Sequence, residues 1–126
     1  MSGATVKPAF WIGSSYKDFR AFPASVQNVM GYALYQAQIG ERHHRAKPLK
    51  GFGGAGVLEI VADNLGDTFR AVYAVKFATA IYVLHAFQKK SKSGIKTSTE
   101  DLILIERRLK AAEADHRDQL GKGKAS

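Results

Sequence analysis

Three strand-like segments follow one another closely, and they limit the folds open to this chain more than any other feature of its sequence. They cover residues 57–62, 68–76 and 80–87 and are rich in β-branched and aromatic residues. The turns between them, DNLGD and FAT, are short. Because parallel neighbours need a long crossover connection, the three segments predict an antiparallel meander.

A helical hairpin is predicted before the meander. Residues 6–12 read as a short strand and residues 16–22 as a short helix. A longer helix begins at Pro23, which suits the first helical position, and Gly40 can end it as a left-handed cap. Its apolar residues recur at the spacing of one helical face: Val26, Val29, Met30, Ala33, Leu34 and Ala37.

A last helix is predicted after the meander. Ser98 and Asp101 resemble a capping box, and an apolar stripe follows at Leu102, Ile105, Leu109 and Ala112. The order β-α-α-β-β-β-α predicts an α+β domain in which the helical hairpin packs on a small antiparallel sheet, with helices on one side. We expect one domain over residues 1–126, with a frayed tail over about 119–126.

The positive charge belongs to the body of the chain. The net charge of the 126 residues is +8, and residues 1–97 hold 13 Lys and Arg against 5 Asp and Glu. A basic surface suits a polyanion, above all nucleic acid. The chain has no cysteine, no apolar signal-peptide core and no apolar run long enough to span a membrane. We therefore expect a soluble cytoplasmic protein without membrane contact.

Two basic clusters flank the meander. One follows its last strand and comprises Lys89, Lys90, Lys92 and Lys96, whereas the other precedes it and comprises Arg42, His43, His44, Arg45, Lys47 and Lys50. If both line one edge of the sheet, they form a phosphate-binding cleft with Arg70 at its floor. Phe52, Tyr73 or Phe87 could stack on an unpaired base there. Charge runs are more often only solvated surface.

Strand alternation sorts the polar side chains by face. Arg70 and Lys76 fall on one face with Val72 and Ala74, and Tyr73 falls on the other. His85 is expected on one face with Ile81, Val83 and Phe87. Glu59, on the neighbouring strand, is a plausible partner for a buried Arg70, which would otherwise be costly. A purely structural role for Arg70 and His85 stays open.

Other chemistries lack their motifs. The sequence contains no P-loop and no GxGxxG, and its histidines lack the spacing of helical metal ligands. The residues thus favour a basic nucleic-acid cleft and give no sign of a cofactor.

The second half of the chain resembles a known family. The run FRAVYAV…AIYVLHAFQKKSKSGIKTSTEDLILIERRLKAA is similar to the phage-derived HigB-like toxins of the RelE/ParE superfamily. That family has F-R-x-x-Y on one strand, L-H-x-F-x-K-K on the next, and I-x-x-R-L on the last helix. The segment KPLKGFGGAGVLEI also resembles its K-x-L-x-G…V-x-E-I pattern. This chain departs from the family at Thr97-Ser98, where threonine-proline is frequent, and in its GFGGAG insertion.

The resemblance implies a type II toxin that cleaves mRNA on the ribosome and thereby inhibits translation, without a metal or other cofactor. The 2′-hydroxyl would attack the adjacent phosphate and leave a 2′,3′-cyclic phosphate. Arg70 would stabilise the phosphorane, and Lys89 or Lys90 would clamp or protonate. Lys50 would contact phosphate or serve as the base, and His85 would be a supporting acid–base or a structural group. The residues expected to contact RNA are Lys47, Lys50, Tyr73, Lys76, Phe87 and Lys92. A cognate helix-turn-helix antitoxin, mRNA and the ribosome are the implied partners.

Three alternatives remain open from the sequence. A ParE-like member of the superfamily would inhibit DNA gyrase and cleave nothing. A non-enzymatic nucleic-acid-binding remnant of phage origin, or a purely structural basic domain, would also have this composition.

Overall fold

Five strands form one mixed sheet, in the order β1-β5-β4-β3-β2, in the computed structural model, which describes residues 6–54, 56–89 and 97–124. The predicted meander is confirmed, because β3, β4 and β5 are successive antiparallel neighbours. The strands are β1 (Ala9–Trp11), β2 (Lys47–Pro48), β3 (Val57–Asn64), β4 (Asp67–Ala74) and β5 (Ile81–Lys89).

The two outer strands differ from the sequence prediction. β1 pairs in parallel with β5, so the expectation of an entirely antiparallel sheet is wrong. The long stretch of chain between β1 and β5 supplies the connection that parallel pairing needs. The two residues of β2 lie between the second helix and the meander, where the predicted order β-α-α-β-β-β-α has no strand, and they pair with β3 at the sheet edge. An edge position tolerates Pro48, which has no N–H to donate.

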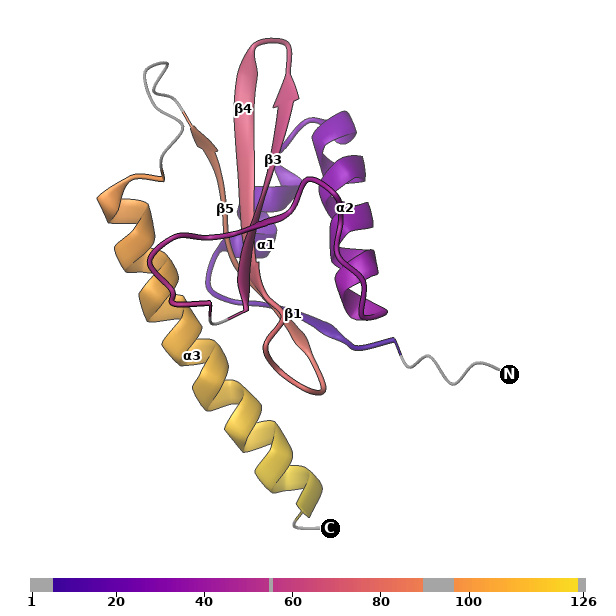
Figure 1. The fold of residues 1–126 in the computed structure, drawn as a ribbon, viewed down its shortest axis with the longest axis vertical. Coiled ribbons are helices and arrows are strands. Elements are labelled where there is room, and N and C mark those ends of the chain that lie inside the picture. The colour runs from indigo at the N-terminus through magenta and orange to yellow at the C-terminus, as the bar shows by residue number, and fades with distance from the viewer. Residues whose placement is uncertain (1–5, 55, 90–96, 125–126) are drawn as a thin grey trace.

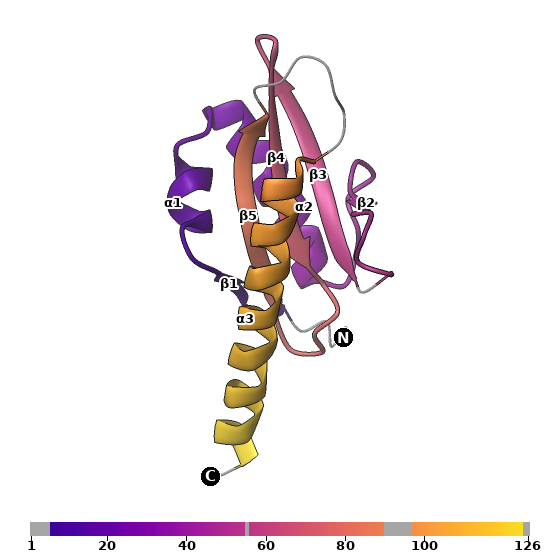
Figure 2. The same ribbon diagram turned by 90° about the vertical axis from the view of Figure 1, so that its left-hand side faces the viewer.

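Helices cover both faces of the sheet, as Figures 1 and 2 show. α1 (Ser15–Arg20) and α2 (Ala24–Gln38) lie on one face, and α3 (Thr99–Lys124) lies on the other. The prediction of helices on one side is therefore wrong. The reason is that β4 is apolar on both faces: Ala71 and Tyr73 join the core under α1 and α2, whereas Val72 and Ala74 join the core under α3. A sheet that is apolar on both faces needs cover on both.

Two predicted helix-capping signals are confirmed, one at the end of α2 and one at the start of α3. Gly40 has a φ of 85° and follows the end of α2, where its N–H bonds to the carbonyl of Ala37. The N–H of Glu41 bonds to the carbonyl of Gln36, which completes a Schellman motif. At the start of α3, the Asp101 N–H donates to Ser98 Oγ, so the capping interaction is confirmed. No helix in the described part of the chain is long and apolar enough to cross a membrane.

A β-bulge in β5 changes which side chains share a face. The β4–β5 register runs from Val72 opposite His85 directly to Tyr73 opposite Val83, so Leu84 is an extra residue. Before the bulge, Ile81 and Val83 belong to the core under α1 and α2, and after it Phe87 packs against the core under α3. His85 therefore shares its face with Phe87 as expected, but the expectation that it also shares the face of Ile81 and Val83 is wrong.

The β3–β4 turn gives a test of the fold. Leu65 and Gly66 have φ values of 51° and 88°, which is the pattern of a type I′ turn, and Leu65 is 96% exposed. Because leucine is disfavoured in this conformation and Asn-Gly is preferred, we expect Leu65→Asn to raise the free energy of unfolding by about 1 kcal/mol. Urea unfolding measures the change. Leu65→Ala is the control for the loss of exposed apolar surface, and an equal gain in both variants would contradict the turn assignment.

Candidate active site

A buried ion pair lies on the α3 face of the sheet. Arg70, in β4, donates from Nη1 to Oε1 of Glu59, in β3, over 2.9 Å. The two side chains are only 7% and 14% exposed. Isolated charges are costly at such depth, and the pair is the partnership that the sequence predicted. Arg70 thereby has a fixed position against Glu59.

The second oxygen of Glu59 is held from α3. Thr97, just before the helix, donates its hydroxyl to Oε2 of Glu59 over 2.7 Å. The carboxylate is therefore bonded at both oxygens and is fixed between two strands and a helix start. Glu59 also lines a cavity of about 410 Å³, whose other walls are Lys47, Pro48, Leu49, Lys50, Thr97 and Leu102. One cavity thus combines an oriented carboxylate with two lysines from the sheet edge.

Lys89 ends β5 on the same face as Arg70. It lies opposite Thr68, two residues before Arg70 in β4. Partial burial lowers the pKa of Lys89, and the positive charge of Arg70 lowers it further, against the opposing charges of Glu59 and Asp101. A lysine with a lowered pKa gives up its proton more readily than an ordinary one. Lys89 is thus suited to proton donation beside the Arg70–Glu59 pair.

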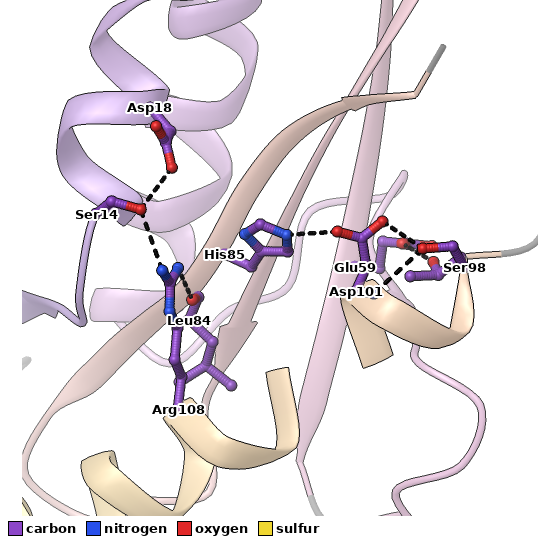
Figure 3. Close-up of polar contacts among 9 residues, drawn as sticks. Ser14, Asp18, Glu59, Leu84, His85, Ser98, Asp101 and Arg108 are labelled. Atoms are coloured by element: carbon purple, nitrogen blue, oxygen red, sulfur yellow. Dashed lines mark hydrogen bonds and ion pairs between the residues drawn. The ribbon is translucent and has the colours of Figure 1, made fainter. Parts of the chain in front are cut away.

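His85 is held by α3 and by its own strand. Its Nε2 lies 2.8 Å from Oδ1 of Asp101, and its ring stacks on Phe87 with centroids 4.4 Å apart. Ser98 donates to the other Asp101 oxygen over 2.7 Å, as Figure 3 shows. Nδ1 of His85 is buried and has no hydrogen-bond partner among the described residues. With one nitrogen bonded to Asp101 and the other buried, His85 supports the site and does not present a nitrogen to a ligand.

Several residues predicted for the site lie elsewhere. Tyr73 is fully buried on the opposite face, under α1 and α2, where burial raises its pKa to about 12. It cannot stack on a base from that position. Lys76 donates to Glu113 of α3 over 2.6 Å and takes no part in the cavity of Glu59. Lys90, Lys92 and Lys96 lie outside the described residues.

The basic residues before β3 also lie in two different places. Lys47 and Lys50 reach the cavity of Glu59, whereas His43, His44 and Arg45 line a different cavity beside Tyr32 of α2. The sequence suggested that the basic cluster before β3 lines one edge of a cleft. In the structure its residues are instead divided between two cavities. Within residues 6–54, 56–89 and 97–124, no group of three His, Asp or Glu side chains is placed to hold a metal ion.

The sequence did not identify two residues of the candidate site, Thr97 and Asp101, and it identified Glu59 only as a partner of Arg70. Thr97 carried no signal, because its contact with Glu59 spans 38 residues. Asp101 was identified only as a capping residue, and its contact with His85 depends on the bulge. Glu59 was recognised as a partner of Arg70, and its place beside Lys47 in the β2–β3 register marks it as part of the cavity.

Chemically, the site offers a fixed carboxylate, a fixed guanidinium and lysines, a set that can bind a phosphate and move a proton.

Comparisons with known proteins identify the family. A search of curated proteins found no match to this chain. The family model of the phage-derived Gp49-like proteins (DUF891) matches residues 17–110, and that family belongs to the clan of RelE/HigB-like toxins. The sheet and C-terminal helix are consistent with a RelE-like fold. The chain therefore belongs to the phage-derived Gp49-like family.

Proposed function

We propose that this chain is the toxin of a type II toxin–antitoxin pair and that it is a metal-independent, ribosome-dependent mRNA endoribonuclease in the cytoplasm. Family membership supports the toxin assignment. The observation that carries the nuclease assignment is Glu59, a carboxylate fixed by Arg70 and Thr97 in the wall of a cavity with Lys47 and Lys50. Cleavage of RNA through its own 2′-hydroxyl needs a base, an acid and positive charge around the phosphate, and these residues can supply all three.

Glu59 is the base in this proposal. Its carboxylate accepts the proton of the ribose 2′-hydroxyl, and the 2′-oxygen forms a bond to the adjacent phosphorus. Arg70, held by the 2.9 Å contact with Glu59, lies next to the developing charge of the phosphorane. A donor held in place before the reaction stabilises that charge without reorganisation.

Lys89 is the acid. Its ammonium donates a proton to the 5′-oxygen as the bond from that oxygen to phosphorus breaks. The products are a 2′,3′-cyclic phosphate and a 5′-hydroxyl, and proton exchange with water returns Glu59 and Lys89 to their starting states. The lowered pKa of Lys89 favours this transfer.

Lys47 and Lys50 bind the RNA backbone at the rim of the cavity, and Lys90 and Lys92, which follow Lys89 in the sequence, are further RNA-binding candidates. The stacked rings of His85 and Phe87 pack beneath the proposed RNA-binding site. A helix-turn-helix antitoxin would neutralise the toxin by placing an acidic segment over this basic surface.

Expression in cells tests the role of Glu59. We expect the wild-type chain to arrest growth and to create new 5′ ends within coding sequences, whereas Glu59→Gln abolishes both. The amide keeps the shape and can still accept from Thr97, but it can neither take the proton nor balance the charge of Arg70. Circular dichroism of the purified variant therefore checks that it is folded. Sequencing of mRNA 5′ ends measures the effect.

Glu106→Gln is the matched control, because Glu106 is an exposed residue of α3 whose contact is an i,i+4 pair with Lys110 at 3.9 Å. We expect it to behave as wild type. Growth arrest by wild type without new mRNA ends, accompanied by gyrase inhibition, would instead support the ParE-like alternative.

The pH dependence of cleavage tests Lys89. An acid acts in its protonated form, so the rate is sustained below the pKa of Lys89 and falls as pH rises through it. Because that pKa is lowered, the alkaline limb begins below the usual range for lysine. Lys89→Arg keeps the charge but not the transferable proton, so we expect RNA binding to persist, the alkaline limb to vanish and the rate to fall about 100-fold.

Single-turnover rates on programmed ribosomes across pH give the profile, with Lys17→Arg on α1 as the control. An unchanged alkaline limb in Lys89→Arg would rule out Lys89 as the acid.

A further inference from the structure

The β-bulge at Leu84 decides which face of the sheet carries Lys89. Successive strand side chains alternate between faces, and one extra residue reverses the order for all that follow. Before the bulge the odd-numbered Ile81 and Val83 lie under α1 and α2. After it Phe87 and Lys89 lie opposite Arg70 and Thr68 on the α3 face, and Ala86 lies under α1 and α2. In a regular strand, Lys89 would point away from Arg70.

α3 contacts both residues of this bulge. Asp101 binds the ring of His85 at 2.8 Å, and Arg108 donates from Nη1 to the backbone carbonyl of Leu84 at 3.0 Å. Asp101 and Arg108 are seven residues apart, which places them on one side of the helix about two turns apart. The helix therefore contacts the bulge at two points, the side chain of His85 and the backbone carbonyl of Leu84.

Arg108 is itself fixed from the opposite direction. Its Nη2 donates to Ser14 Oγ at 3.1 Å, and Ser14 donates to Asp18 Oδ2 at 2.8 Å, as Figure 3 shows. Gly13 adjoins this contact with a φ of 59°, and a Cβ there would come within 2.9 Å of Arg108 Nε. Glycine leaves room for the guanidinium between the start of α1 and β5. Arg108 thus joins α1, the bulge and α3.

We propose that Arg108 is a positioning residue that stabilises the bulge in β5 and so keeps Lys89 on the face of Arg70 and Glu59. The consequence for cleavage depends on the proposed ribonuclease function, whereas the consequence for strand register does not. Arg108 does not line the cavity of Glu59. It acts through the Leu84 carbonyl, which fixes the extra residue and the alternation that follows.

Comparison of Arg108→Met, Arg108→Lys and Tyr82→Phe with the wild type tests the proposal. Tyr82→Phe is the matched control, because it removes a 2.6 Å hydrogen bond from β5 to Asp115 of α3 that involves neither Leu84 nor His85. NMR cross-strand contacts between Val72 and His85 report the register, and single-turnover cleavage across pH reports the placement of Lys89.

We expect Arg108→Met to lose the Val72–His85 contact and the alkaline limb of the pH profile, and to cleave about 100-fold more slowly, as misplacement by about 1 Å can produce. Arg108→Lys can still donate to the Leu84 carbonyl and should recover part of the rate. Tyr82→Phe should keep both the register and the limb. Wild-type register in Arg108→Met, or a rate no lower than that of Tyr82→Phe, would overturn the proposal.

If Arg108→Met does not fold, Arg108→Lys decides the question. A weakened Val72–His85 contact with a reduced rate supports the positioning role, and wild-type values for both overturn it. If the wild-type chain cleaves no RNA, the proposed function fails, but the NMR comparison still decides whether Arg108 sets the register of β5.

Discussion

The buried Arg70–Glu59 ion pair is the interaction on which the rest of the site depends. Removing one partner of such a pair leaves a buried charge, at a typical cost of about 3 to 5 kcal/mol. The pair is therefore retained in one geometry, with Glu59 bonded on its other oxygen to Thr97 at the entry of α3. The same bonds that satisfy the charges fix the carboxylate in the cavity wall. The stability of the fold and the proposed chemistry therefore depend on the same contacts.

α3 has a comparable double role. Its apolar stripe covers the second face of the sheet through Ile105, Leu109 and Ala112. Its polar residues Asp101 and Arg108 contact the β5 bulge, which determines the face of every later side chain in that strand. The helix that completes the core thus also sets the surroundings of Lys89.

The elements followed from the sequence better than their arrangement did. Short turns predicted the meander, apolar periodicity predicted the two longer helices, and the Ser98–Asp101 spacing predicted the cap of α3. The parallel pairing of β1, the cover on both faces and the bulge at Leu84 depend on long-range packing that no local pattern encodes. For the site, strand alternation placed Arg70 correctly and found Glu59, but it failed for His85 past the bulge. The same alternation placed Tyr73 correctly on the face opposite Arg70, and the expectation that Tyr73 contacts RNA beside Arg70 conflicted with that placement. The single-domain organisation and the residue roles stay predictions.

The chemistry of RNA ends tests the central claim most directly. Purified wild-type protein is incubated with a defined mRNA, with and without programmed ribosomes, and both ends of each fragment are analysed. We predict cleavage with ribosomes, 5′ ends that accept phosphate from a kinase without prior dephosphorylation, and 3′ ends that carry a 2′,3′-cyclic phosphate. Fragments with 5′-phosphate and 3′-hydroxyl ends, or intact mRNA in every reaction, would contradict cleavage by Glu59, Arg70 and Lys89 through the 2′-hydroxyl.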